Sequence, residues 1–148
     1  MASYCAEADL VKVRPNIMLL GVDTWADQIA ESDAIIDRTI EARWYRAACK
    51  AYSLDYRETP FDRDLLLSAA AELTRLGTYK TLELAYIFLQ KEAEDADPFE
   101  RQAGNFRKMY TNELSEVLAA GLSYDWNQGG DLDYTEKSLP VTRRLVRV

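Results

Sequence analysis

The sequence contains no histidine, which removes the side chain most used for acid–base catalysis, for activating a nucleophile and for binding zinc. It contains only two cysteines, Cys5 and Cys49, at no metal-binding spacing, so we expect reduced thiols in a cytoplasm, with Cys49 packed on a helix. No apolar run approaches the about 18 residues of a membrane span. The N-terminus lacks the basic and apolar regions of a secretory signal, so neither a membrane span nor secretion is expected.

Recognisable catalytic patterns are also missing. Close pairs of carboxylates are abundant, but in a chain with 25 acidic residues they arise from composition and indicate a solvated acidic face. The run NQGGD is followed by neither Lys-Ser/Thr nor a helix, so it does not predict a phosphate-binding loop. Ser53 and Ser68 have no histidine partner, and nothing indicates a Ser-Lys pair. We therefore predict that the protein is not an enzyme.

What the chain does contain suits one acidic domain. Its 148 residues match a typical domain, and 48% hydrophobic residues are enough for a packed core. The last 12 residues hold four positive charges and no acid: Lys137, Arg143, Arg144 and Arg147. Residues 1–136 therefore carry a net charge of −11, against −7 for the whole chain. Such a body repels phosphates and is not expected to bind nucleic acid, whereas the basic ending suits an acidic partner.

Apolar residues recurring at steps of three and four predict helices. The run AEADLVKVR predicts a short helix of about two turns, ended near Pro15 by that residue's missing N–H. A long helix is expected over about residues 33–54, with Ser32 as its N-cap and Asp33 at the positive helix end. Its expected apolar stripe consists of Ile36, Ile40, Trp44, Ala47, Ala51 and Leu54.

A third helix is expected to begin in the run TPFD. Thr59 is its predicted N-cap, Pro60 its first residue and Asp62 the partner in a capping-box-like pair. Its apolar stripe reaches Gly77 and resumes beyond it as far as Leu89. Because one glycine costs only about 1 kcal/mol inside a helix, either one helix bends at Gly77 or two helices meet there.

The run DPFE begins a fourth helix, with Asp97 as its cap and Pro98 inside it. This helix is expected to reach about residue 122, a length of about 35 Å at 1.5 Å per residue. Its apolar face, interpreted as core, consists of Phe99, Ala103, Phe106, Tyr110, Leu114, Leu118 and Leu122.

These elements predict an all-α fold: a bundle of three to four main helices plus a short N-terminal helix, with an extended, β-prone C-terminal tail. Residues 1–122 are expected to form the helical bundle domain. Residues 123–137 form a Gly/Asp-rich loop, and residues 138–148 form the basic tail.

The loop SYDWNQGGDLDYTEK comes close to a calcium-binding pattern. The residues at ligand positions are Asp125, Asn127, Asp133 and Glu136, and Gly130 lies at the glycine position. Gly129, however, supplies no side-chain oxygen at the fifth position, and Pro140 opposes an exiting helix. The pattern favours a turn with exposed acids, with a bound calcium ion as the alternative. No other cofactor is predicted.

Two tryptophans lie in predicted loops, Trp25 in DTWADQ and Trp126 in the glycine-rich run. A large aromatic residue in a loop either packs on the core or anchors a partner, and the sequence favours neither. We keep Trp126 as a candidate partner contact for this reason.

The order of these pieces resembles the head-to-tail connector proteins of tailed bacteriophages, also called adaptor or neck proteins. The pieces that carry the resemblance are YCAEADL, IIDRTIEARWYRAA, LLLSAAAELTRLGTY after a proline, FRKMYTNELSEVL, and the ending from YDWNQGGDLDYTE to RRLVRV. They span nearly the whole chain. One departure is Ala6, which stands where the family carries a helix-capping threonine; Asp9 still lies in the first turn.

The resemblance implies a structural virion protein rather than an enzyme. Family members form a ring beneath the portal, which is twelve-fold, extend the DNA channel and provide the platform for the next neck or tail component. The implied partners are the portal protein, neighbouring copies of the chain in a dodecameric ring, and a further neck or tail-terminator protein. DNA passes through the lumen without specific binding, and no membrane is involved. The implied location is the neck of the virion, after assembly in the cytoplasm of a bacterial host.

The residue chemistry fits this role independently, because a duplex slides past an acidic wall without sticking. The tail is then predicted to bind the portal or a neighbouring subunit. Its predicted contact residues are Val141, Arg143, Arg144, Leu145, Val146, Arg147 and Val148. The alternatives are a small calcium-binding regulatory module that uses loop 125–136, a generic helical interaction module of a host cell, and a tail without a specific role. A head-closure or tail-completion protein is a further alternative, which the helical pattern disfavours.

Overall fold

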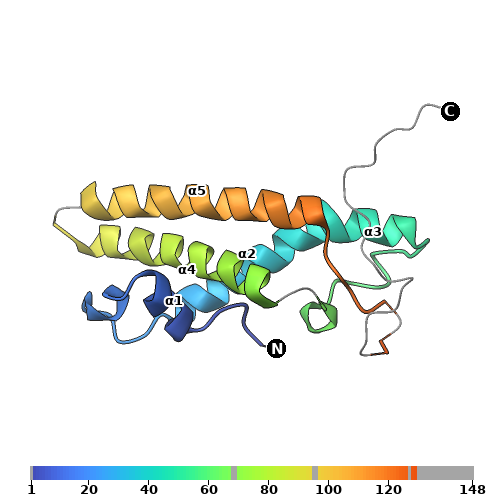
Figure 1. Ribbon diagram of the computed structural model, residues 1–148, viewed down its shortest axis with the longest axis horizontal. Helices are drawn as coiled ribbons and strands as arrows, with labels where there is room; N and C mark the ends of the chain where they lie inside the picture. The colour runs from blue at the N-terminus through green and yellow to red at the C-terminus, as the bar shows by residue number, and fades with distance from the viewer. Residues whose placement is uncertain (1, 68–69, 95–96, 127, 130–148) are drawn as a thin grey trace.

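The computed structural model describes residues 2–67, 70–94, 97–126 and 128–129 (Figure 1). Within these ranges the chain is mostly helical and contains no strand; one antiparallel bridge joins Leu66 to Tyr124. This confirms the predicted all-α bundle. The predicted tail, residues 138–148, and most of the predicted loop 123–137 lie outside the described residues.

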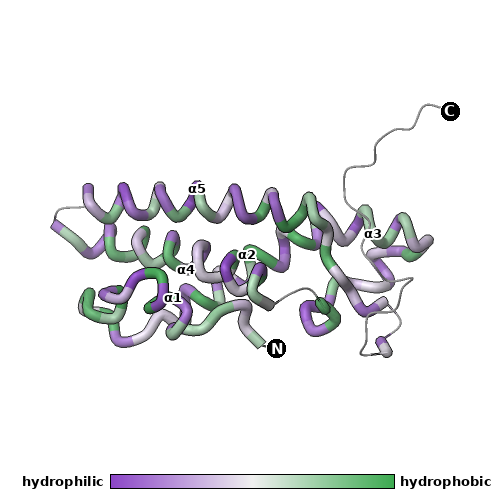
Figure 2. The backbone as a smooth tube through the Cα atoms, in the orientation of Figure 1, coloured by the Kyte–Doolittle hydropathy of each residue, from purple (hydrophilic) through white to green (hydrophobic). Residues whose placement is uncertain are grey.

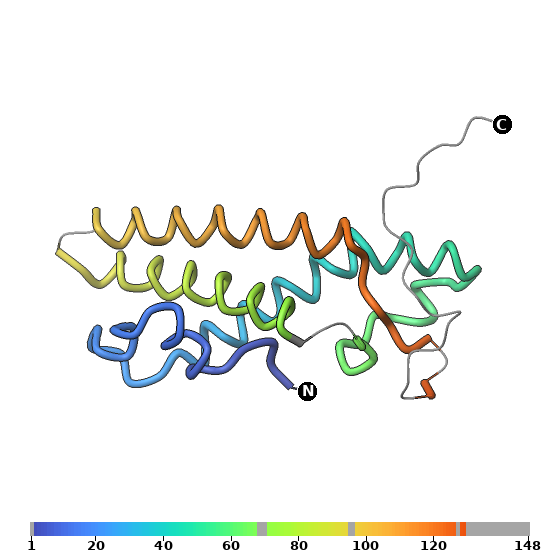
Figure 3. The backbone as a smooth tube through the Cα atoms, viewed as in Figure 1, coloured from blue at the N-terminus to red at the C-terminus, as the bar shows by residue number. Residues whose placement is uncertain are grey.

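The longest helices form an antiparallel hairpin. They are α4, Ala70–Glu92, and α5, Asp97–Ala120, which lie side by side along the long axis of the molecule (Figure 1). The helix α2, Ala26–Ile40, packs against α4 and crosses behind the hairpin (Figure 3). It continues without a break into a π-helical turn, η2, Glu41–Tyr45, and then into α3, Arg46–Ala51.

The predicted short N-terminal helix is present as α1, Glu7–Val13, and it packs on α4. Ala6 supplies no side-chain cap, but the carboxylate of Asp9 accepts a hydrogen bond from the Ala6 N–H at 3.0 Å. Half of a capping box therefore forms without the threonine. A short 3-10 turn, η1, Ile17–Leu19, follows and leads into α2.

The predicted start of the long helix at Ser32 is wrong. The helix begins at Ala26, and Ser32 is buried in its middle, where its hydroxyl donates to the Gly77 carbonyl at 3.3 Å. Asp33 accepts the Tyr4 N–H at 3.1 Å instead of capping a helix end. A buried serine interrupts the apolar stripe, and this hides the continuity of the helix from Trp25 onwards.

The predicted stripe is correct up to Trp44 and wrong beyond it. Ile36, Ile40 and Trp44 are buried, but the predicted stripe residues Ala47, Ala51 and Leu54 are exposed. The buried residues after Trp44 are instead Tyr45 and Cys49. A π-helical turn holds more residues than an α-helical turn, so it moves the buried face along the sequence. Cys49 is packed as predicted.

No helix begins at Pro60. Residues 52–67 form a loop, in which the carboxylate of Asp62 caps a single 3-10 turn, η3, Arg63–Leu65, by accepting the Asp64 N–H at 3.0 Å. After this turn the chain is extended, and the Leu67 N–H donates to the Ser123 carbonyl at 2.9 Å. The capping signal is therefore used for a short turn, because the next residues pair with the segment that follows α5.

The helix α4 runs through Gly77 without interruption, so residues on both sides of the glycine belong to one helix. A Cβ atom at Gly77 would lie 2.8 Å from the Tyr4 Cβ atom, which is closer than real contacts allow. Gly77 therefore lets the N-terminal segment lie directly on α4.

The predicted α5 is confirmed from Asp97 to its last turn, and Gly121, with φ of +82°, ends it. Apolar and polar positions alternate along α4 and α5, as expected for helices with one buried face (Figure 2). Buried side chains form two clusters. The first, named here the proximal core, lies around α1 and the loop end of the hairpin and includes Leu10, Ile17, Trp25, Leu82 and Phe106. The second, the distal core, includes Ile40, Trp44, Tyr45, Leu114 and Tyr124.

Candidate functional site

The distal core ends in a cluster of aromatic rings where the chain leaves the bundle. The rings of this aromatic cluster belong to Trp44, Tyr45, Tyr52, Phe61, Tyr124 and Trp126. They come from η2, from the end of α3, from the loop 52–67 and from the segment after α5, which runs beside that loop in Figure 3. The cluster therefore joins two distant parts of the sequence, residues 44–61 and 124–126, at one end of the molecule.

The two loop tryptophans both pack on the core. Trp25 is fully buried, and its indole N–H donates to the Ile17 carbonyl at 3.3 Å. Trp126 is half-buried and stacks on Tyr45 with ring centroids 5.7 Å apart and an angle of 6° between the planes. Its centroid also lies 4.6 Å from that of Tyr52. Whether Trp126 contacts a partner as well stays a prediction.

Asp125, the first predicted calcium ligand, is buried with 4% of its surface exposed. One of its carboxylate oxygens accepts the Gly129 N–H at 3.0 Å, and its own N–H donates to the Leu65 carbonyl at 2.8 Å. These bonds are typical of a turn, which is the interpretation that the sequence favours over a metal loop. The other predicted ligands, Asn127, Asp133 and Glu136, lie outside the described residues.

No metal-binding group of three or more acidic or cysteine side chains is present in the parts of the chain that the structure describes. Calcium binding by loop 125–136 therefore stays a prediction. The predicted contact residues of the tail also lie outside the described residues: Val141, Arg143, Arg144, Leu145, Val146, Arg147 and Val148.

A buried ionic cluster that the sequence did not predict lies beside the aromatic cluster. The Arg63 guanidinium donates to Asp33 at 3.2 Å and to both carboxylate oxygens of Asp37. It also donates to the Ala2 carbonyl at 3.1 Å and lies 4.7 Å above the Tyr4 ring. The hydrogen bonds to the Asp37 carboxylate are the main reason that the pKa of Arg63 is raised, and the negative charges of Asp37 and Asp33 raise it further.

Tyr4 completes this cluster. Its hydroxyl donates to Asp37 at 2.6 Å. Burial, followed by this bond to a carboxylate, raises the pKa of the Tyr4 phenol well above its usual value, so the hydroxyl stays protonated. The cluster ties the N-terminal segment to α2 and to the loop 52–67. Only the four-residue spacing of Asp33 and Asp37 could have suggested it, because it places both carboxylates on one helix face.

An open groove of about 570 Å³ lies next to this cluster. We name it the acidic groove, because six carboxylates line it: Asp37, Glu41, Glu58, Asp62, Asp64 and Asp125. Arg63 is the basic residue among the lining side chains. Apolar side chains from the aromatic cluster and its neighbours also line the groove: Leu54, Pro60, Phe61, Leu65, Tyr124 and Trp126. The groove thus combines an aromatic wall with excess negative charge.

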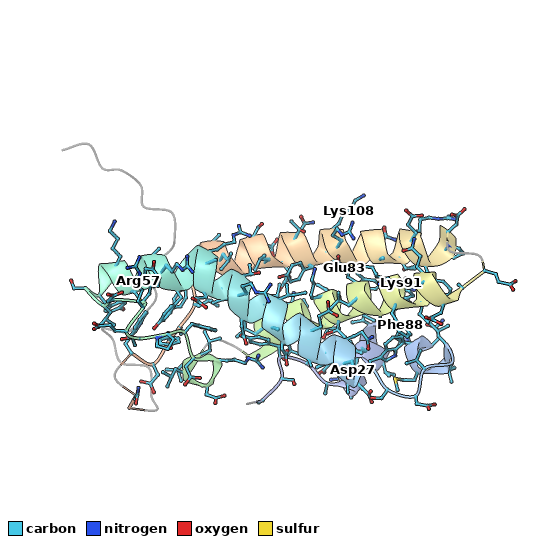
Figure 4. The ribbon with its side chains drawn as sticks, turned by 180° about the vertical axis from the view of Figure 1, so that it is seen from behind. Asp27, Arg57, Glu83, Phe88, Lys91 and Lys108 are labelled. Atoms are coloured by element: carbon cyan, nitrogen blue, oxygen red, sulfur yellow. The ribbon has the colours of Figure 1, made fainter. Side chains whose placement is uncertain are left out.

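Buried acids elsewhere have basic partners. Glu83 is labelled in Figure 4 between the hairpin helices. Its carboxylate accepts hydrogen bonds from the side chains of Lys80 and Arg107, each at 2.9 Å. Glu113 pairs with Arg75 at 3.6 Å. The pairs of Glu83 with Arg107 and of Glu113 with Arg75 each join α4 to α5.

The two thiols also lie inside the bundle. Cys5 and Cys49 are buried and not joined in a disulfide. Burial raises the pKa of each thiol, which keeps the nucleophilic thiolate form scarce.

Comparison of the chain with protein-family models, with curated proteins and with solved structures gives no match. Among the described residues, no helix is both long enough and apolar enough to span a membrane.

Proposed function

We propose that the protein is a head-to-tail adaptor of a tailed bacteriophage. It would form a ring beneath the portal, extend the DNA channel and provide the platform for the next neck or tail-terminator component. The observation that carries the proposal is the separation of charge and structure along the chain. An acidic helical bundle is followed by a short segment that holds four cations and no acid.

The acidic bundle suits the wall of a DNA channel. Residues 1–136 carry a net charge of −11, and like charge keeps a sliding duplex from adhering to the wall. The Arg63 side chain is only 13% exposed and is paired with Asp33 and Asp37, so its positive charge is largely withdrawn from the surface. A subunit of this kind guides DNA by repulsion and needs no base contacts.

The elongated hairpin suits a subunit of a ring. A ring needs two different faces on each subunit, and the molecule offers two different ends. At one end of the molecule α4 ends and α5 begins (Figure 1). The aromatic cluster and the acidic groove lie at the other end. The basic ending then provides a contact to the portal or to a neighbouring copy.

Deletion of residues 138–148 tests this proposal. The truncated protein should keep its helical circular dichroism but fail to bind the portal protein encoded in the same genome, as judged by co-sedimentation. Full binding by the truncated chain would refute the role of the tail.

A charge reversal separates electrostatic attraction from shape. Arg143→Glu with Arg144→Glu should weaken portal binding, and the variant should respond less to added salt than the natural chain. An unchanged salt response would remove the electrostatic part of the proposal.

A further inference from the structure

We infer that the acidic groove binds the basic C-terminal segment, residues 137–148, of a second copy of this chain. The inference deepens the proposed function, and its choice of a second copy rests on the proposed ring. The groove has the size of a ligand pocket, about 570 Å³, within a usual range of about 300–1,000 Å³.

The rim of the groove offers carboxylates that have no cation. Glu58, Asp62 and Asp64 are exposed, and none of them forms an ion pair within the described residues. The lining guanidinium of Arg63 does not neutralise them, because it is held by Asp33 and Asp37. The rim therefore keeps the capacity to bind added positive charge.

The wall of the groove offers apolar surface. Leu54 is 40% exposed, and Phe61 and Trp126 are only half-buried. These exposed parts of the side chains can pack against apolar side chains of a docked segment.

The π-helical turn η2 lies at the same place. Glu41, its first residue, lines the groove, and Tyr45, its last residue, stacks on Trp126. Single π-helical turns inside α-helices are frequent at functional sites. The position of the π-helical turn beside the groove therefore supports a functional role for the groove.

The C-terminal segment matches both halves of the groove. It mixes cations with apolar residues, and the two kinds would meet the rim and the wall. Its cations are Lys137, Arg143, Arg144 and Arg147, and its apolar residues include Val141, Leu145, Val146 and Val148. An isolated metal ion or a purely basic peptide would use the rim alone.

The described chain ends at the groove, because Gln128 lines it. The seven residues from 130 to 136 can span up to about 25 Å when extended, so the segment that begins at Lys137 can reach beyond its own subunit. Docking on the next copy gives a contact between two different surfaces, which is the kind of contact that closes a ring.

Two charge-reversed full-length chains test the inference. The tail-reversed chain carries Arg143→Glu and Arg144→Glu and keeps its groove. The groove-reversed chain carries Glu58→Lys and Asp64→Lys at exposed positions and keeps its tail. A control chain carries Glu72→Lys and Glu116→Lys, two exposed acids on α4 and α5 that do not line the groove.

The first measurement is fluorescence anisotropy of a labelled synthetic peptide, residues 137–148, at low salt. The peptide should bind the tail-reversed chain, and adding Glu58→Lys and Asp64→Lys to that chain should weaken binding at least about tenfold, or 1.4 kcal/mol. Adding the control substitutions to that chain instead should change binding less than about twofold. Equal weakening by both pairs of substitutions, or no binding at all, would overturn the inference.

The second measurement is sedimentation of mixed chains. Neither reversed chain should associate alone, but an equimolar mixture should form dimers, because one supplies a tail and the other a groove. A mixture that stays monomeric although the free peptide binds would show that a tail attached to one subunit does not reach the groove of another, which would overturn the second-copy assignment. These experiments contain no portal, so failure to bind a portal would count against the proposed function alone.

Discussion

The two hydrophobic clusters of this protein close the bundle in different ways. In the proximal core, the buried tryptophan has a hydrogen-bond acceptor, since Trp25 donates to Ile17. In the distal core, two indole N–H groups, of Trp44 and Trp126, have no acceptor within the described residues. The indole N–H of the proximal core is therefore satisfied within the bundle. The distal core instead ends in aromatic rings that loops cover only in part, beside the acidic groove.

The two clusters also differ in the segments that build them. The proximal core is built mainly from helices and a capped helix start, whereas the aromatic cluster depends on the loop 52–67 and on the segment after α5. Loops positioned by a rigid scaffold are where binding residues concentrate. The distal end is therefore the part of the molecule that a partner is expected to cover.

The largest expected effect concerns the ionic cluster that holds the distal loop. Arg63→Met leaves the buried carboxylate of Asp33 without a cation, so we expect a loss of about 3–5 kcal/mol in the free energy of unfolding. Urea denaturation measures it. Arg57→Met is the matched control, because Arg57 lies exposed in the same loop (Figure 4), and it should change stability by less than about 0.5 kcal/mol. Similar values for the two variants would mean that the ionic cluster does not hold the loop.

A second comparison uses glycines in the two helices of the hairpin. Gly77→Ala forces a Cβ atom against Tyr4 and should destabilise the protein by about 1–3 kcal/mol. Gly104→Ala, in α5, meets nothing within 4 Å and should stabilise it by about 0.5–1 kcal/mol, because alanine favours a helix. Thermal unfolding of both variants shows whether each substitution raises or lowers the stability of the protein. Stabilisation by Gly77→Ala would contradict the close contact of the N-terminal segment.

The same substitution at the two tryptophans tests the contrast between the clusters directly. Trp25→Phe leaves the Ile17 carbonyl without its donor and also removes buried ring volume, at a cost of about 1–3 kcal/mol. Trp126→Phe removes a donor that has no acceptor within the described residues, so the cost should be smaller than about 1 kcal/mol. Chemical denaturation of the pair measures the difference. A larger loss at Trp126 would reverse the comparison.

The smallest effect concerns the proximal end and depends on pH. A hydrogen bond from the Thr24 hydroxyl, followed by one from the Trp25 N–H, lowers the pKa of Glu7 below its ordinary value of 4.5. A lowered pKa in the folded state contributes stability that is present above the ordinary pKa and is lost as pH falls through the lowered pKa. Glu7→Gln should therefore destabilise the protein slightly at neutral pH and hardly at all in acid. Urea midpoints at both pH values test this, and a difference that grows in acid would contradict it.

The sequence predicted the elements whose contacts are periodic. The stripe from Phe99 to Leu118 predicted α5, because one helix face packs these residues against α4 and its neighbours and buries all of them except the partly buried Phe99. The start of α2 was missed because Ser32 and Asp33 look like a cap, while their partners, Gly77 and Tyr4, lie far away in the sequence.

The candidate site depends on features that periodicity does not encode. The π-helical turn shifts the buried face from Ala47 to Tyr45 and Cys49, and this turn has no local signal in the sequence. The groove forms because residues after Pro60 pair with residues around Tyr124, more than 50 positions later. Pairings of such long range follow from the packed structure, not from local propensity.

Electron microscopy of the full-length protein, mixed with the portal protein encoded in the same genome, tests the central proposal most directly. The proposal predicts a ring of subunits added to one end of the portal, coaxial with its channel, with the C-terminal segment of each subunit on another polypeptide. Portals that remain bare at saturating protein concentration, or a C-terminal segment folded on its own subunit, would contradict it.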